Sequence, residues 1–151
     1  MYERLYVAFL VYFNRDRDYF ECHEVLEELW LDTDKDPRYK GLLQAAVALF
    51  HFRNDNIRGG LKMFRSAVNK LEGYAEDELG IRMGKLVEEM REYVRGLSGY
   101  EQHPIPYRDL TIDIVDPKLR KAVDEASRHI PPNVPQRRKP ERPRAKQGLS
   151  S

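Results

Sequence analysis

The sequence contains one cysteine, Cys22, among its 151 residues. A single cysteine cannot form a disulfide within the chain, and it cannot supply the several thiolates of a structural zinc knuckle. We therefore do not expect a disulfide-stabilised secreted domain, and an intracellular, reducing environment is the default. Cys22 itself is expected to be a small core residue rather than a nucleophile.

Long apolar runs are also missing. The two longest, residues 42–52 and 7–13, are well short of the ~20 residues that span a bilayer. Residues 1–5 lack the basic region and the small-residue cleavage site of a signal peptide. We therefore expect a soluble, cytoplasmic protein without a membrane segment.

A strong net charge is absent, because 26 Lys and Arg balance 25 Asp and Glu. This balance gives no general argument for binding to nucleic acid or membrane. The charges are nevertheless uneven: residues 131–151 hold six basic residues and one acidic residue, whereas the other 130 residues hold 20 basic and 24 acidic. Five of the nine prolines also lie in the last stretch. We predict a helical domain over residues 1–130 and a flexible, Pro/Arg-rich, extended tail over residues 131–151.

The tail supports one hypothesis of function. Its Arg and Lys side chains within residues 137–146 are expected to make a weak, salt-sensitive contact with a polyanion or an acidic partner. No aromatic residue is present in the tail to stack on bases. A solubilising appendage without a dedicated partner explains the same composition equally well.

Apolar residues recur at spacings of three and four over most of the first 130 residues, which indicates helices. The third helical segment is apolar almost all round and is expected to be central. The predicted fold class is all-α: a single compact bundle of about five main helices, a short C-terminal helix and an extended tail. The helices are expected over residues 5–13, 20–30, 38–53, 57–71, 78–96 and 117–128.

Two features mark the boundaries of these helices. Asn56 and Asp116 are expected N-caps, and Pro117 suits the first helical position.

Between the last two helices, Leu110, Ile112 and nearby apolar residues alternate with polar ones. This alternation fits an extended segment laid against the bundle, because no partner strand is evident.

Four polar side chains fall on helix faces that we expect to be buried. His23 and Glu27 are one turn apart on the second helix, and Gln44 and His51 share one strip of the central helix. A buried Gln or His without a partner costs about 1–3 kcal/mol, so the two pairs are expected to meet. We therefore predict one internal polar cluster of His23, Glu27, Gln44 and His51.

The residues around this cluster resemble a known family. The run from Asp18 to Trp30, DYFECHEVLEELW, is followed by the string GLLQ ending at Gln44 and by His51-x4-Asn56-x2-Gly-Gly. Over roughly residues 5–75 this combination is similar to the bacterial and archaeal family called domain of unknown function 309. The resemblance implies a small all-helical fold and supplies no established activity, substrate or cofactor.

Three chemical roles of the cluster stay open at this point. It is a hydrogen-bonded network that fixes helix register, a pocket for a small organic ligand, or a metal site. In the metal version, His23, Glu27 and His51 would hold a divalent transition metal, zinc, iron or manganese. A hydrolase-type enzyme would then polarise a metal-bound water that Gln44 orients. The sequence does not decide whether the protein is an enzyme.

Three further residues lie at the periphery of the cluster. His23, Glu24 and Glu27 approximate half of the zinc-protease motif H-E-x-x-H, but Glu27 stands where the second His belongs and Glu24 is expected to face solvent. Trp30 is expected to anchor its helix in the core rather than to serve as a ligand platform. Asn56 follows the central helix as the cap of the next one.

A homo-oligomer is a further hypothesis. Tyrosines at both ends of the bundle would suit a self-association surface, because their rings combine apolar area with a polar tip. They are Tyr2, Tyr6, Tyr12, Tyr93 and Tyr100.

Overall fold

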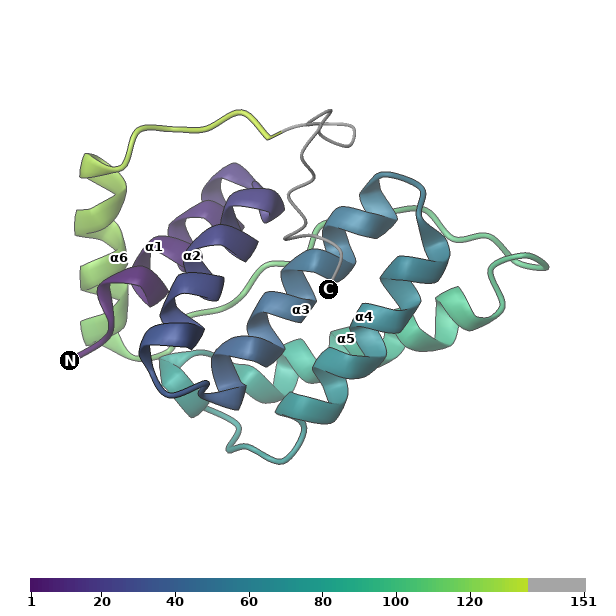
Figure 1. The fold of residues 1–151 in the computed structure, drawn as a ribbon, viewed down its shortest axis with the longest axis horizontal. Helices are drawn as coiled ribbons and strands as arrows, with labels where there is room; N and C mark the ends of the chain where they lie inside the picture. The colour runs from purple at the N-terminus through teal and green to yellow at the C-terminus, as the bar shows by residue number, and fades with distance from the viewer. Residues whose placement is uncertain (136–151) are drawn as a thin grey trace.

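The computed structural model describes residues 1–135 and shows an all-α fold (Figure 1). Within that range no strand forms, and the only β-type pairing is an isolated antiparallel bridge between Ile81 and Ile114. The predicted fold class is therefore confirmed. The basic residues 137–146 lie outside the described part of the chain. The α-helices are α1 (Arg4–Val11), α2 (Tyr19–Asp32), α3 (Pro37–Arg53), α4 (Ile57–Leu71), α5 (Met83–Ser98) and α6 (Pro117–His129).

Helix α3 is the centre of the bundle. Residues 41–50 are all buried, as the apolar sequence predicts. Helices α2 and α4 both pack on α3, and Figure 1 shows them on its two sides. The packing of α4 on α3 is close, because a Cβ atom built on Gly60 would lie 3.3 Å from Cβ of Phe52. The apolar faces of the neighbouring helices thus converge on one central rod.

Side chains cap four of these helices. The carboxylate of Asp18 accepts the amide of Glu21 at the start of α2. Asn56 accepts the amide of Gly59 at 2.9 Å. Asp116 accepts the amide of Lys118 at 2.9 Å. The predicted N-caps Asn56 and Asp116 are confirmed, and both satisfy amides that the first helical turn leaves unpaired. Asp36 caps α3 in the same way, with Pro37 at the first helical position.

The ends of two helices differ from the sequence prediction. Helix α1 continues as a π-helical turn, Tyr12–Asp16, and the chain reverses at Arg17, whose φ is 53°. Helix α5 begins at Met83 rather than at residue 78, because residues 78–80 form a 3₁₀ turn in which Leu79 has a φ of 61°. A left-handed residue cannot continue an α-helix, so the apolar spacing across this turn was misleading.

The segment between α5 and α6 lies against the bundle in extended form, as predicted. Leu110 and Ile112 are 1% and 2% exposed. Asn14 accepts the amide of Ile112 and donates to its carbonyl oxygen, both at 2.9 Å. An amide side chain here replaces the partner strand that the extended backbone lacks.

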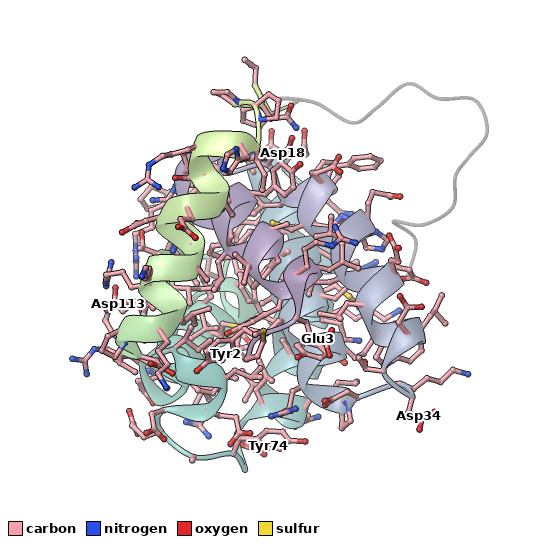
Figure 2. The ribbon with its side chains drawn as sticks, turned by 90° about the vertical axis from the view of Figure 1, so that its left-hand side faces the viewer. Tyr2, Glu3, Asp18, Asp34, Tyr74 and Asp113 are labelled. Carbon is pink, nitrogen blue, oxygen red and sulfur yellow. The ribbon has the colours of Figure 1, made fainter. Side chains whose placement is uncertain are left out.

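Helix α6 packs on α1, and the residues that follow it are tied to the turn before α2. Asn133 donates from its backbone to Asp16 at 3.2 Å and from its side chain to Asp18 at 2.8 Å. Figure 2 shows Asp18 beside the C-terminal end of α6. The first residues beyond α6 are therefore joined to the helical body through two carboxylates.

Gly80 is the glycine on which the turn before α5 depends. Its φ is 76°, and a Cβ atom there would lie 2.6 Å from the Tyr2 hydroxyl oxygen. We expect Gly80→Ala to lower the free energy of unfolding by about 1–3 kcal/mol, because both backbone strain and the steric contact act in the same direction. Urea unfolding measures this loss. Gly73→Ala is the control, since no atom lies within 4 Å of its Cβ position; an equal loss in both variants would contradict the prediction.

Candidate functional site

His23 is buried on the inner side of α2 and lies beside two carboxylates of its own helix. Its Nδ1 is 3.5 Å from Oε2 of Glu24, and its Nε2 is 3.9 Å from Oε1 of Glu27. The two glutamate side chains are 51% and 43% exposed. Glu27 thus begins on the apolar stripe, as the sequence predicts, but its carboxylate reaches solvent. A long side chain with a charged end takes this path because burying the charge is costly.

Gln44, 7% exposed, is held by α4. The hydroxyl of Ser66 donates to Oε1 of Gln44 at 2.9 Å, and Nζ of Lys70 donates to the Ser66 oxygen at 3.2 Å. The sequence pattern did not identify Ser66 or Lys70 as partners. Their one-turn spacing on α4 is the only sequence signal, and it does not show which helix they face.

His51 lies at the end of α3, next to the cap of α4. Its Nδ1 is 3.3 Å from Nδ2 of Asn56, and Oδ1 of the same Asn56 accepts the amide of Gly59. Since the amide nitrogen can only donate, this contact is a hydrogen bond when Nδ1 of His51 is unprotonated. Asn56 therefore links the last turn of α3 to the first turn of α4.

Trp30 joins α2 to the start of α3, as an anchor of the helix would. The ammonium group of Lys40 lies 4.4 Å from the centre of the Trp30 ring, and that of Lys35 lies 5.8 Å from it. These distances fit cation–π contacts. The half-buried ring is thereby covered by the side chains of two lysines.

The metal hypothesis gains no support from this part of the chain. Across residues 1–135, no three His, Cys, Asp or Glu side chains converge on a point that could hold a metal ion. His23 and Glu27 are close to each other, and His51 contacts Asn56. A three-ligand site needs all its donors about 2 Å from one point.

Charge is separated between the two helices that flank α3. Helix α2 contains five acidic residues and no Lys or Arg, and helix α4 contains four basic residues and no acid. Arg58, Lys62 and Arg65 are exposed along α4, and we call them the basic stripe. No carboxylate within residues 1–135 lies at ion-pair distance from the stripe; Arg65 only donates to the Ser98 hydroxyl, at 3.3 Å. The basic excess in the sequence lies in residues 131–151, so composition alone does not point to this stripe.

A hollow of about 470 Å³ adjoins the basic stripe at Arg58. Its apolar lining comes from the start of α4, the end of α5 and the turn after α5. The apolar residues are Ile57, Leu61, Leu97 and Tyr100. Arg58 of the basic stripe therefore borders a partly apolar surface, and the exposed acid Glu101 lies on the same lining.

The tyrosines proposed for self-association do not form one surface. Tyr6 is fully buried and donates to the carbonyl oxygen of Leu79 at 2.8 Å. Tyr93 is 4% exposed and donates to the carbonyl oxygen of Arg108 at 2.6 Å. Burial raises the pKa of both hydroxyls. These two side chains belong to the core, which corrects that part of the oligomer hypothesis.

The Gln44–Ser66 hydrogen bond is testable by a double-mutant cycle. Gln44→Met keeps the volume and removes the acceptor, and Ser66→Ala removes the donor. We expect each variant to lose about 0.5–1.5 kcal/mol of unfolding free energy, with the double variant losing less than the sum. Chemical denaturation measures the coupling. Strictly additive losses would show that the two side chains do not interact.

Comparisons with known proteins agree with the resemblance in the sequence. The family model described as domain of unknown function (DUF309) matches residues 6–63. The uncharacterized protein YpuF of Bacillus subtilis strain 168 is 37% identical over 117 residues, which are 72% of this chain and 67% of that protein. An uncharacterized protein of Aquifex aeolicus strain VF5 is 30% identical over 88 residues, 56% of this chain and 25% of that protein. No solved structure matches the chain significantly.

Proposed function

The chain belongs to the DUF309 family, and we propose that it is an interaction module that binds an acidic, amphipathic protein segment on the basic stripe of α4. The observation that carries this proposal is the stripe itself. Three exposed bases, Arg58, Lys62 and Arg65, lie on a helix without an acid, although acidic residues outnumber basic ones over residues 1–135. Positive charge without a nearby acid, on a body with more acids than bases, marks a surface that attracts a negatively charged partner.

The spacing of the stripe fits a regular partner. Arg58, Lys62 and Arg65 are four and three residues apart, so they share one face of the helix. At ~1.5 Å per residue the stripe is about 10 Å long. A partner helix with acids one turn apart places its carboxylates at matching intervals.

The neighbouring hollow supplies apolar contact area, which ion pairs alone do not provide. An exposed ion pair contributes about 0–1 kcal/mol, so three such pairs give weak binding. Apolar side chains of a partner that cover Leu61 and Tyr100 would add burial at ~25 cal/mol per Å². The occupant that fits both features is amphipathic as well as acidic.

Nucleic acid fits this surface less well. A duplex carries one charge about every 1.7 Å along its axis, so most of its phosphates would meet no basic residue on a stripe that is only about 10 Å long. The basic residues 137–146 lie outside the described part of the chain and remain a second proposed contact for an acidic partner or a polyanion.

A second copy of the chain is one source of an acidic segment. Glu24, Glu28 and Asp32 are exposed and one turn apart on α2, which contains no Lys or Arg. This pattern is complementary to the basic stripe and supports the homo-oligomer proposal on a different surface from the tyrosines. A salt-sensitive dimer in sedimentation equilibrium would identify this occupant.

Charge reversal tests the stripe directly. The probe is a synthetic helical peptide with glutamates one turn apart and leucines on the adjoining face. We expect Lys62→Glu/Arg65→Glu to weaken its binding to the full chain by at least tenfold, since two attractions become repulsions. Fluorescence anisotropy at two salt concentrations measures the affinity, and circular dichroism checks the fold.

Lys118→Glu/Lys121→Glu is the matched control, because both lysines are exposed on α6 and the change in net charge is the same. We expect its affinity for the peptide to equal that of the native chain. An equal loss in the control, or tighter binding of a DNA duplex than of the peptide at equal salt, would overturn the proposal.

A further inference from the structure

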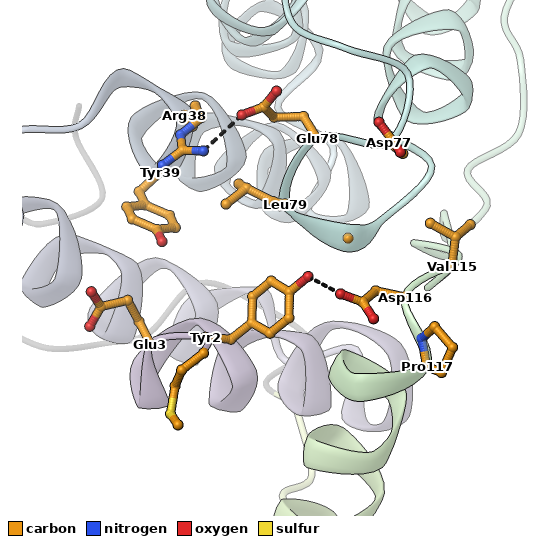
Figure 3. A pocket seen from close by; sticks show the side chains of 12 residues that line it. Tyr2, Glu3, Arg38, Tyr39, Asp77, Glu78, Leu79, Val115, Asp116 and Pro117 are labelled. Carbon is orange, nitrogen blue, oxygen red and sulfur yellow. Dashed lines mark hydrogen bonds and ion pairs between the residues drawn. The ribbon is translucent and has the colours of Figure 1, made fainter.

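Four segments distant in the sequence meet at a cleft near the N-terminus (Figure 3). Its volume is about 790 Å³. The lining comes from residues 1–3, the start of α3, the 3₁₀ turn before α5, and residues 115–117 ahead of and within the first turn of α6. We call it the N-terminal cleft. The side chains that carry the argument are Tyr2, Glu3, Tyr39, Asp77 and Asp116.

The backbone around the cleft is held in place. Leu79 and Gly80 both have positive φ, 61° and 76°. The carbonyl oxygen of Gly80 accepts the amides of Val115 at 2.9 Å and Asp116 at 3.2 Å. A non-glycine residue in the left-handed region costs about 1–3 kcal/mol and persists only where the surrounding structure enforces it. The walls are therefore preorganised.

Negative charge dominates the lining. Glu3, Asp77, Glu78 and Asp116 outnumber the two cationic groups there, the guanidinium of Arg38 and the amino group of Met1. Arg38 is already engaged, because it lies 2.8 Å from Asp36 and 2.8 Å from Glu78. Tyr2 donates to Asp116, which lowers the pKa of that carboxyl and raises the pKa of Tyr2 to about 12.

Two carboxylates of the cleft are uncommitted. Glu3 and Asp77 are exposed. No Lys or Arg within residues 1–135 forms an ion pair with either of them. They lie on different segments, so they face the cleft from separate walls (Figure 3). A ligand with two separated positive charges would satisfy both.

Tyr39 provides an independent sign of a ligand. Its side chain is buried, with 5% of the residue exposed. Its hydroxyl points into the cleft (Figure 3). No side chain or carbonyl within residues 1–135 forms a hydrogen bond with this hydroxyl. The other buried tyrosines, Tyr6, Tyr19 and Tyr93, each donate to a carbonyl or carboxylate. A buried side chain whose hydroxyl group reaches an open cleft is a ready partner for a polar ligand.

The lining favours an organic cation over a metal ion. The carboxylates do not converge in a group that could hold a metal. Leu79, Val115 and Pro117 provide apolar surface between the charged groups. The Tyr2 ring, which lines the cleft, adds a face that attracts an ammonium group. An aliphatic chain with an ammonium at each end matches all three kinds of surface.

We propose that the N-terminal cleft binds a free aliphatic polyamine, with its ammonium groups on Glu3 and Asp77 and one N–H donated to the Tyr39 hydroxyl. This site is separate from the basic stripe of α4. It takes a ligand of opposite charge and does not depend on the function proposed above.

Calorimetric titration of the full chain with spermidine tests the proposal. Glu3→Gln/Asp77→Asn removes two charges from exposed positions without changing shape, and we expect it to weaken spermidine binding by at least tenfold. Tyr39→Phe removes a hydroxyl that has no partner, so we expect unchanged thermal stability together with an affinity about tenfold lower. A purely structural role of Tyr39 would leave the affinity unchanged.

Asp124→Asn/Glu125→Gln is the matched control, because it removes two exposed acids of α6 that do not line the cleft. We expect it to bind spermidine as the native chain does. A peptide that carries two lysines tests whether the ammonium groups come from a protein. If this peptide binds more tightly than spermidine, the ligand of the cleft is a lysine-containing peptide and not a free polyamine. Competition by Mg²⁺ at equal ionic strength, or no binding of spermidine at all, would overturn the proposal.

Discussion

The complete burial of residues 41–50 in α3 is the constraint from which the other features of the bundle follow. Because residues 41–50 have no exposed face, a polar side chain among them needs a partner from a neighbouring element. Gln44 finds one in Ser66, and His51, at the last turn, contacts the cap of α4. Helices α2 and α4 each bury one face on this rod and turn the other outward. Their outer faces are then free to carry charge, and they carry charge of opposite sign.

The sequence could predict what depends on a single helix. The almost uniformly apolar sequence of α3 predicted its central position. The caps Asn56 and Asp116 followed from residue type and position, and the inward placement of His23 and Gln44 followed from the helical wheel. The partners of those residues could not be predicted, because a wheel does not state which helix packs opposite. Thus the Ser66 contact of Gln44 was unforeseen, and the reach of Glu27 to solvent depends on rotamers that sequence spacing does not specify.

The turn before α5 shows a second limit. Apolar spacing of 3.6 residues continues through Leu79 to Met83, yet the backbone between them is left-handed. Leucine gives no signal for such a conformation, since positive φ is unusual for it. The turn is fixed instead by contacts from distant segments, including the Tyr6 hydroxyl and the amides of residues 115 and 116. The N-terminal cleft depends on the same contacts, so it too was beyond the reach of local sequence patterns.

Net charge proved a poor guide to the surfaces of this protein, and the reason is screening. At physiological ionic strength the field of an exposed charge decays over about 8 Å. Packed helices are about 8–10 Å apart, and α2 and α4 lie on either side of α3, so their outer faces are separated by more than one screening length. A ligand near the basic stripe therefore responds chiefly to Arg58, Lys62 and Arg65, whatever the charge of the whole chain. For the same reason, a ligand in the N-terminal cleft responds chiefly to the carboxylates that line the cleft. A chain whose total charge is +1 can thus present an anion-binding surface and a cation-binding surface together.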